Sequence, residues 1–114
     1  MKLLTVAVPC YNSQEYMHYC IQTLLSGGEE VEILIINDGS KDDTARIADQ
    51  YAAAYPTIIR AIHQENKGHG GAVNTGMANA TGKYFKVVDS DDWVDVRAYL
   101  KIIEQLQRFE ETGE

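Results

Sequence analysis

Short apolar runs alternate with longer segments of helical spacing along the whole sequence, and this alternation constrains the fold more than any other feature. Short runs bounded by turn residues are typical of buried strands, whereas apolar residues three and four positions apart mark one face of a helix. Strands that alternate with helices predict parallel βαβ units. We expect strands at residues 3–8, 31–37, 57–63 and 84–88, and helices with apolar faces at 17–25, 47–55, 72–80 and 94–109.

Three right-handed crossovers joining four parallel strands predict an α/β fold of strand order 3-2-1-4, with helices on both faces of the sheet. Residues 33–36 are continuously apolar, so the second strand is expected to be central and covered on both faces. This order places the carboxyl ends of the first and fourth strands side by side. The 114 residues are expected to form a single domain.

Local residues set the expected limits of these elements. Pro9 is expected to stop the first strand, and Asn12 is expected to cap the helix that follows. Glu15 stands three residues after Asn12, which is the spacing of a capping box. Ser40 and Asp43 indicate a second capped helix start in the same way.

Three carboxylates follow the fourth expected strand within four positions, at Asp89, Asp91 and Asp92. Open α/β sheets bind their ligands outside the carboxyl ends of the strands. Acids this close repel one another, and a divalent cation is the simplest way to keep them ionised together. Alternate residues can bring Asp89 and Asp91 toward one Mg²⁺ or Mn²⁺ ion, since both metals prefer oxygen ligands. The alternative, a carboxylate that caps the next helix, explains one acid but not three; Trp93 is expected to be a core aromatic.

Three further loops are expected at the same edge, and each has a functional and an ordinary interpretation. Tyr11 is either an aromatic ring that stacks on a planar base or a half-buried tyrosine. Asp38 is either an acceptor for a nucleobase or ribose or a turn residue before glycine. Residues 66–71 place backbone amides and a cation just before a helix, which suits an anion cradle or a flexible connector.

Composition narrows the classes of partner. The net charge of −7 argues against a nucleic-acid-binding module, although a small phosphate ligand remains compatible if a cation bridges it. No apolar run approaches the roughly 20 residues of a membrane helix, so a cytoplasmic location is expected, at the inner face of the membrane in a longer protein. Cys10 and Cys20 are expected to be free, buried thiols.

Taken together, these motifs resemble a known family. The chain resembles the amino-terminal, nucleotide-binding half of a family 2 (GT-A type) glycosyltransferase, and the similarity runs through nearly the whole sequence in family order and spacing. The resemblance implies a Rossmann-like GT-A fold for this half. The segments that carry it are residues 6–12, 37–44, 63–68, 72–76, 80–84 and 89–93.

The resemblance also implies roles for individual residues. Pro9 and Tyr11 match the loop that packs on the donor base, and Asp38 matches the acid that contacts the base. Asp89 matches a carboxylate that approaches the ribose, and Asp91 matches the ligand of Mn²⁺ or Mg²⁺. The expected nucleotide-binding residues are Pro9, Tyr11, Asp38, Lys67, Gly68, Asp89 and Ser90, and the expected metal ligands are Asp89 and Asp91.

Two positions depart from the family pattern. Asn37 stands where an aspartate is usual, and its amide still offers hydrogen bonds. Val73 stands where an arginine is common, which removes a side-chain contact there. Lys67 or His69 is a candidate for the compensating positive group.

The function implied is an inverting, metal-dependent transfer of a sugar from a nucleotide diphosphate donor, with a UDP-sugar favoured, to an acceptor saccharide or lipid-linked saccharide, as in polysaccharide biosynthesis. The family's acceptor half and its general base are expected outside this chain, because Asp95, Glu104 and Glu110 fall on or near a helix that packs elsewhere. The chain is therefore interpreted as a truncated domain that binds donor only.

Two rival interpretations remain. The first is a non-catalytic nucleotide- or partner-binding module that docks on another subunit through residues 94–109. The second, a receiver-type domain, would need acids on the first strand, which Pro9, Cys10 and Tyr11 do not provide. Truncation would leave the fourth strand without its family neighbours, and this open edge predicts self-association into a homo-oligomer.

Overall fold

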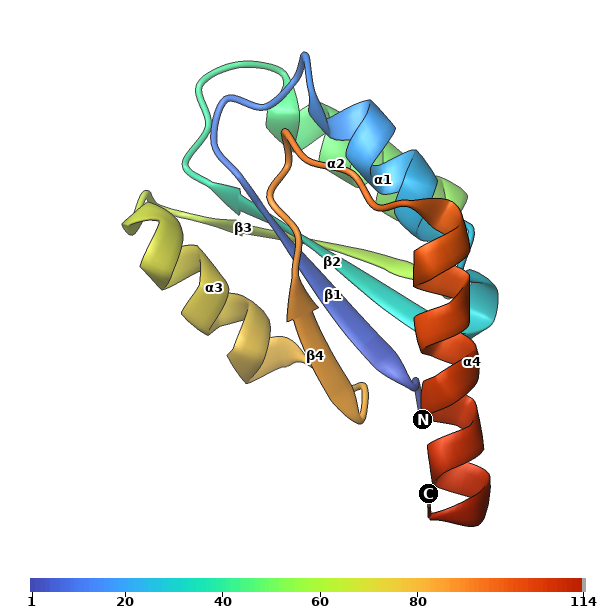
Figure 1. Cartoon of the computed structure of the whole chain (residues 1–114). Helices are drawn as coiled ribbons and strands as arrows, with labels where there is room; N and C mark the ends of the chain where they lie inside the picture. The colour runs from blue at the N-terminus through green and yellow to red at the C-terminus, as the bar shows by residue number, and fades with distance from the viewer. Residues whose placement is uncertain (114) are drawn as a thin grey trace.

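Four parallel strands form the centre of the molecule in the computed structural model, which describes residues 1–113 (Figure 1). Their order is β3-β2-β1-β4, which confirms the predicted order. The strands are β1 (Leu4–Cys10), β2 (Val31–Asp38), β3 (Ile59–Gln64) and β4 (Tyr84–Val87). The helices are α1 (Met17–Leu25), α2 (Thr44–Ala54), α3 (Gly68–Asn79) and α4 (Val96–Thr112), and a 3-10 turn, Gly28–Glu30, precedes β2.

Helices cover both faces of the sheet, as expected, but they are unevenly divided. α1, α2 and α4 lie on one face, and α3 alone lies on the other (Figure 1). β2 is buried along its whole length, which confirms its central position. The larger core cluster joins β1 and β2 to the three helices and includes Val6, Ile33, Ile21, Ile47 and Ile103. The smaller cluster under α3 contains Leu34, Ile36 and Ala72.

Small residues let α3 lie close to the sheet. Ala72 is fully buried under the helix. A Cβ atom added at Gly76 would lie 2.8 Å from the Cβ of Ala7, so a larger residue there would force α3 and β1 apart. This close approach fixes α3 over the sheet, and its first turn comes to the edge where β1 and β2 end (Figure 1).

The prediction that Pro9 stops the first strand is wrong, because β1 continues to Cys10 and Pro9 pairs with Ile36 of β2. The backbone of Ala7 faces β4, since its carbonyl accepts from the Val88 amide at 3.0 Å. Strand residues two apart face the same side, so the position of the missing Pro9 N–H also faces that side. β4 ends at Val87, and a proline is tolerated because no ladder bond is needed there.

The predicted caps of the first two helices are also wrong. Asn12 lies five residues before α1, with a positive φ of 50°, and its side chain accepts from the Lys41 amide instead. Ser40 accepts from the Asn12 amide, and Asp43 makes no side-chain cap. These polar side chains join the loop after β1 to the loop after β2. The local pattern suits a cap, but long-range partners take the side chains.

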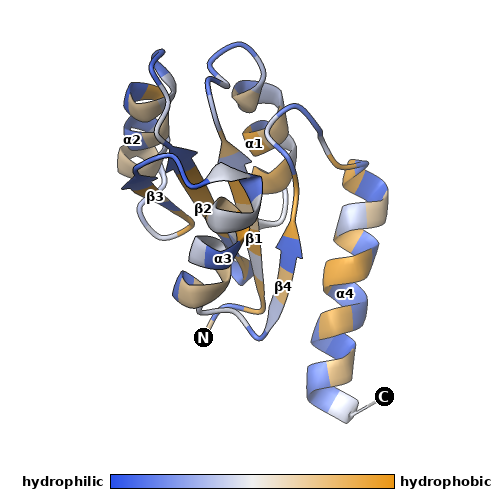
Figure 2. Cartoon of the chain, turned by 90° about the vertical axis from the view of Figure 1, so that its left-hand side faces the viewer, coloured by the Kyte–Doolittle hydropathy of each residue, from blue (hydrophilic) through white to orange (hydrophobic). Residues whose placement is uncertain are grey.

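α4 is amphipathic, with apolar and polar bands alternating along it (Figure 2). Tyr99 and Ile103 are buried, and the Tyr99 hydroxyl donates to the Leu24 carbonyl of α1 at 2.8 Å. Asp95 caps the helix by accepting from the Ala98 amide, so neither Asp89 nor Asp91 is its cap.

Trp93 is not a core residue, contrary to expectation. It is 58% exposed, and its ring lies 5.2 Å from that of Tyr19. The helix begins at Val96, so Trp93 falls on the preceding loop, where the core is out of its reach.

Both cysteines are free and buried, as predicted. Burial, and for Cys20 also the nearby carboxylates, raises the pKa of each thiol to about 12, so both thiols stay protonated at neutral pH.

None of the helices within residues 1–113 is both long and apolar enough to cross a membrane.

Candidate functional site

The loops after β1 and β4 meet at the carboxyl edge of the sheet, as the strand order predicts. The hydroxyl groups of Ser13 and Ser90 lie 2.7 Å apart and share a hydrogen bond. The Cys20 thiol donates to the carbonyl of Asp89 at 3.6 Å. These contacts hold the acidic segment beside the loop that carries Tyr11.

A cavity of about 260 Å³ lies between the ends of β1 and β2 and the start of α3. It contains four of the residues predicted to bind nucleotide, and the side chain of Tyr11 at its rim is half exposed. The residues that line it are Pro9, Cys10, Tyr11, Asp38, Asn66, Gly68, His69 and Ala72. Cys10, Asn66 and Ala72 were not among the predicted site residues, although all three fall in segments that carry the family resemblance.

Asp38 is buried at the floor of this cavity and held in one orientation. Its Oδ1 accepts from the Gln64 side chain at 2.9 Å and from the Lys67 amide at 2.7 Å. Its carbonyl accepts from the Asn66 side chain. Gly39 follows with a φ of +72°, and a Cβ there would lie 2.7 Å from the Asn66 nitrogen. The turn therefore requires glycine, and the carboxylate is fixed before any ligand arrives.

Lys67 contributes differently from the expectation. The residue acts on Asp38 through its backbone amide, and it does not line the cavity. Gly68 does line it and begins α3 with a φ of +79°. Ser90 is buried, and its hydroxyl joins the two loops.

The three acids after β4 are exposed and gathered. One carboxylate oxygen from each of Asp89, Asp91 and Asp92 lies within 4.8 Å of the others. The Asp92 amide donates to the Asp89 carbonyl at 2.9 Å, and this turn brings the third acid back toward the first. Asp92 thus joins the two predicted ligands, and the density of acids in the sequence was the signal for it.

His69 connects the two parts of the site. It lines the cavity that contains Tyr11, and it also lines a second hollow of about 320 Å³ beside Asp89, Asp92 and Lys86. Its Nε2 lies 2.7 Å from Asp89 Oδ1. The cavity near Asp38 and the acidic cluster therefore adjoin each other across this one side chain.

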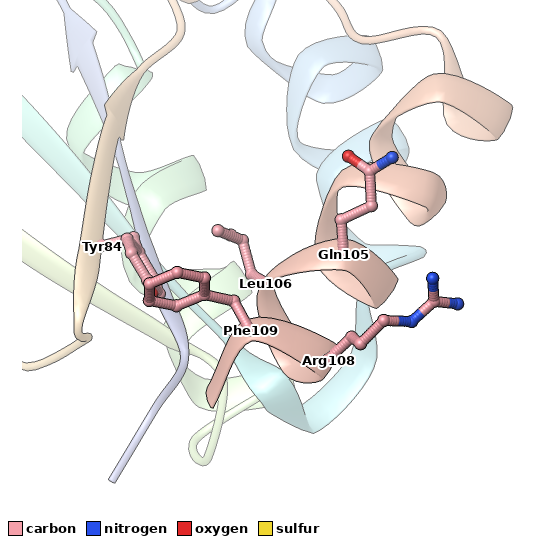
Figure 3. A pocket seen from close by; sticks show the side chains of 5 residues that line it. All are labelled: Tyr84, Gln105, Leu106, Arg108 and Phe109. Carbon is pink, nitrogen blue, oxygen red and sulfur yellow. The ribbon is translucent and has the colours of Figure 1, made fainter. Parts of the chain in front are cut away.

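Two more voluminous hollows lie elsewhere, between β4 and α4, at about 490 and 460 Å³. Figure 3 shows one of them, in which Phe109 points toward Tyr84 whereas Arg108 points away. The lining is mainly apolar, lies on the side of β4 that faces α4, and includes none of the three acids of the cluster. This surface suits packing rather than phosphate or metal chemistry.

Comparison with known proteins places this geometry in context. The profile of the family described as Glycosyl transferase family 2 matches residues 5–113. The glycosyltransferase EpsJ of Bacillus subtilis (strain 168) is 36% identical over 107 residues, which cover 93% of this chain and 31% of EpsJ. The chain spans less than a third of the length of this relative.

Solved structures share the fold. The structure of Staphylococcus aureus TarS 1-349 in complex with UDP-GlcNAc superposes with a TM-score of 0.81 at 25% identity, covering 96% of this chain and 32% of the TarS 1-349 chain. The mannosyltransferase PcManGT of Pyrobaculum calidifontis, in complex with GDP-Man and Mn²⁺, gives a TM-score of 0.76 at 24% identity over 85% of this chain and 30% of that one. The sheet order, the site's place at the carboxyl edge and the family match lead to one conclusion: this chain belongs to glycosyl transferase family 2.

Proposed function

We propose that this chain is the donor-binding part of a glycosyltransferase that moves a sugar from a nucleoside diphosphate, with UDP favoured, to an acceptor hydroxyl. The observation that carries the proposal is the adjacency of the Asp38 cavity and the acidic cluster, with His69 between them. A nucleoside diphosphate has a planar base at one end and two phosphates at the other. The two parts of the site offer partners for both ends.

The base end is assigned to the cavity. Asp38 presents a fixed carboxylate there, which can accept a hydrogen bond from a ring N–H such as that of uracil. Tyr11 offers a half-exposed ring at the rim, and Pro9 offers an apolar wall. UDP-GlcNAc in the related TarS supports a uridine donor for this chain.

The phosphate end is assigned to Asp89, Asp91 and Asp92 together with Mn²⁺ or Mg²⁺. Oxygen ligands of an octahedral ion about 2.1 Å away lie roughly 3–4 Å from one another, so the acids need only small side-chain rotations to share one ion. Held by these carboxylates, the metal would act as a Lewis acid and would stabilise negative charge on the leaving nucleoside diphosphate. Without a cation the same carboxylates would repel the diphosphate.

The acceptor site and the general base of the inverting reaction are proposed to lie outside these residues. The acids of the last segment have structural partners: Asp95 caps α4, Glu104 pairs with Arg108, and Glu110 pairs with Lys83. None of these acids lines the Asp38 cavity. Because the chain spans only part of its relatives, we propose that a further segment supplies the acceptor half.

Calorimetry with UDP tests the donor site directly. The unaltered chain is expected to bind UDP in the presence of Mn²⁺ and to lose that binding when the metal is chelated. Asp91→Ala removes one carboxylate from the cluster and should weaken Mn²⁺-dependent binding by at least about tenfold. Glu104→Ala, an exposed acid on α4, is the matched control and should bind UDP as the unaltered chain does.

Unchanged Mn²⁺-dependent binding in Asp91→Ala would contradict the assignment of the metal site. No binding of UDP by the unaltered chain would favour the rival, a non-catalytic partner-binding module. The apolar residues that α4 leaves exposed, including Leu100 and Ile102, are the observation that keeps this rival open.

A further inference from the structure

A chain of hydrogen bonds outside the donor cavity begins at Asn37, the last residue but one of β2. The Asn37 Oδ1 accepts from the Ser40 amide at 3.1 Å, and its Nδ2 lies 3.0 Å from His63 Nδ1. A backbone N–H is always a donor, so the atom that faces Ser40 must be the oxygen. The Asn37 amide group therefore has one orientation, with its NH₂ directed at the His63 ring.

This orientation determines the protonation state of His63. The ring nitrogen that faces an NH₂ group must accept, so Nδ1 carries no proton. The proton of the neutral ring is then on Nε2, which lies 2.7 Å from Asp49 Oδ1 and donates to it. One assignment, the neutral Nε2–H form, satisfies all three residues at once.

The same chain of bonds reaches the loop that lines the cavity. The Ser40 hydroxyl accepts from the Asn12 amide at 2.9 Å, and the Asn12 side chain accepts from the Lys41 amide at 2.8 Å. Asn12 has a φ of 50°, a conformation that is uncommon for residues other than glycine, and these hydrogen bonds help to hold it. Tyr11, which lies next to it, is at the cavity rim.

We propose that His63 is a positioning residue: its neutral Nε2–H form orients Asn37, and Asn37 through Ser40 holds the loop of Tyr11 and Asn12. The effect on nucleotide binding rests on the function proposed above. The hydrogen-bond chain itself is independent of that function and can be tested without any ligand.

Protonation of His63 would disturb this arrangement. Among the described residues, α2 directs one charged group at the ring, Asp49, while Arg46 of the same helix pairs with Asp43. β2 presents the neutral amide of Asn37. A second ring proton, on Nδ1, would face the Asn37 NH₂, donor against donor. If the amide turned to accept, its NH₂ would face the Ser40 N–H. Acidification should therefore loosen the loop.

Nuclear magnetic resonance of the ¹⁵N-labelled chain tests the hydrogen-bond chain. At neutral pH the His63 ring should carry its proton on Nε2 only. The amide signals of Asn12 and Lys41 should shift in step with the titration of the His63 ring. Asn37→Asp keeps an acceptor for Ser40 and also offers one to Nδ1, so it should place protons on both nitrogens at neutral pH. In this variant the loop signals should no longer follow acidification.

Binding of UDP with Mn²⁺ provides the second measurement. His63→Phe keeps a ring but removes both hydrogen bonds, and it should weaken binding by about two- to tenfold, the usual worth of one such bond. The affinity of the unaltered chain should fall more steeply on acidification than that of Asn37→Asp; the titration of UDP itself is common to both. His18→Phe is the matched control, because His18 of α1 bonds to Tyr51 of α2 and takes no part in the hydrogen-bond chain from Asn37. It should leave the affinity for UDP and its pH profile unchanged.

The outcomes separate the two proposals. A His63 proton on Nδ1 at neutral pH, or loop signals that ignore the titration, would overturn the positioning role whatever UDP does. Identical pH profiles for the unaltered chain and Asn37→Asp would do the same. Failure of the unaltered chain to bind UDP, with the expected ring and loop signals, would overturn the donor site and leave the hydrogen-bond chain established.

Discussion

At the scale of single residues, the candidate site depends on a few side chains placed where β1 and β2 end. Pro9, Tyr11 and Asp38 line one cavity because each lies at or just past the end of a strand, and β1 and β2 end at the same edge. Lys67 was expected for its charge, yet it acts on Asp38 through its amide. Whether a loop residue presents its backbone or its side chain depends on the path of the whole loop, and no local pattern records that path.

Asp38→Asn is the sharpest change at this scale. The Gln64 side chain and the Lys67 amide donate to Oδ1, so the oxygen of the new amide should stay at that position. The NH₂ group then takes the place of Oδ2. An acceptor for the base then becomes a donor, and UDP affinity measured by calorimetry should fall about tenfold, as for the loss of a hydrogen bond to a charged group. Asp43→Asn, a substitution of an exposed acid on the other side of the loop, should leave affinity unchanged. Equal losses in both variants would show that charge alone matters.

At the scale of elements, the order and type of the helices and strands were predictable, because apolar periodicity reflects burial directly. The boundaries were not, and particular residues show why. A proline usually ends a strand. Pro9 does not, because the position of its missing N–H is on the side of β1 where β4 has already ended. Asn12 has cap chemistry, but the Lys41 amide, 29 residues away, takes its side chain. Such choices depend on neighbours that are distant in sequence.

The amino end of the sheet contains a buried acid that sequence reasoning passed over. Glu32 accepts from the Thr5 hydroxyl at 2.9 Å and from the Thr81 amide at 3.0 Å, and it pairs with Arg60 at 3.3 Å. Burial alone would raise the pKa of Glu32, but these hydrogen bonds and Arg60 outweigh it and lower the pKa below its ordinary value. The ionised form therefore stabilises the junction of β1, β2 and the turn before β4.

Glu32→Gln should lower the free energy of unfolding at pH 7 by about 1–3 kcal/mol, the cost of leaving buried partners unsatisfied. A depressed pKa contributes stability that is complete above the pKa of the unfolded chain and is lost as pH falls through the folded-state pKa. The difference between the two proteins should therefore shrink below about pH 4.5, the ordinary value. Urea denaturation at several pH values measures it. Glu15→Gln, at an exposed glutamate, is the control, and a difference that grew on acidification would contradict the role of Glu32.

At the scale of the whole molecule, β4 is an edge strand of only four residues, and the apolar hollows beside α4 lie next to it. The Tyr84 amide donates to the carbonyl of Leu3, just before β1, and the Val88 amide donates to the carbonyl of Ala7 within it. By strand alternation the Phe85 and Val87 amides face the open side, where they can pair with another chain. Self-association through this edge stays a prediction.

Val87→Pro tests that prediction with little disturbance inside the sheet. It removes an outward N–H and leaves the bonds between β4 and β1 in place. Light scattering over a range of concentrations should show mass rising with concentration for the unaltered chain and a constant monomer mass for the variant. Lys86→Pro, whose N–H faces β1, should instead lower the melting temperature. A constant monomer mass for the unaltered chain would refute the idea.

The unequal lengths of β1 and β4 help to explain why the carboxyl edge of the sheet is open beside the aspartates. A parallel ladder could continue past Ala7 only if the residue at position 9 had an N–H to give to the fourth segment. Pro9 stands there and has no N–H, so the backbone that carries the aspartates finds no further donor on β1 and turns out toward solvent. The missing N–H of Pro9 thus favours a short fourth strand, and the short strand leaves the segment with the aspartates free to border an open hollow.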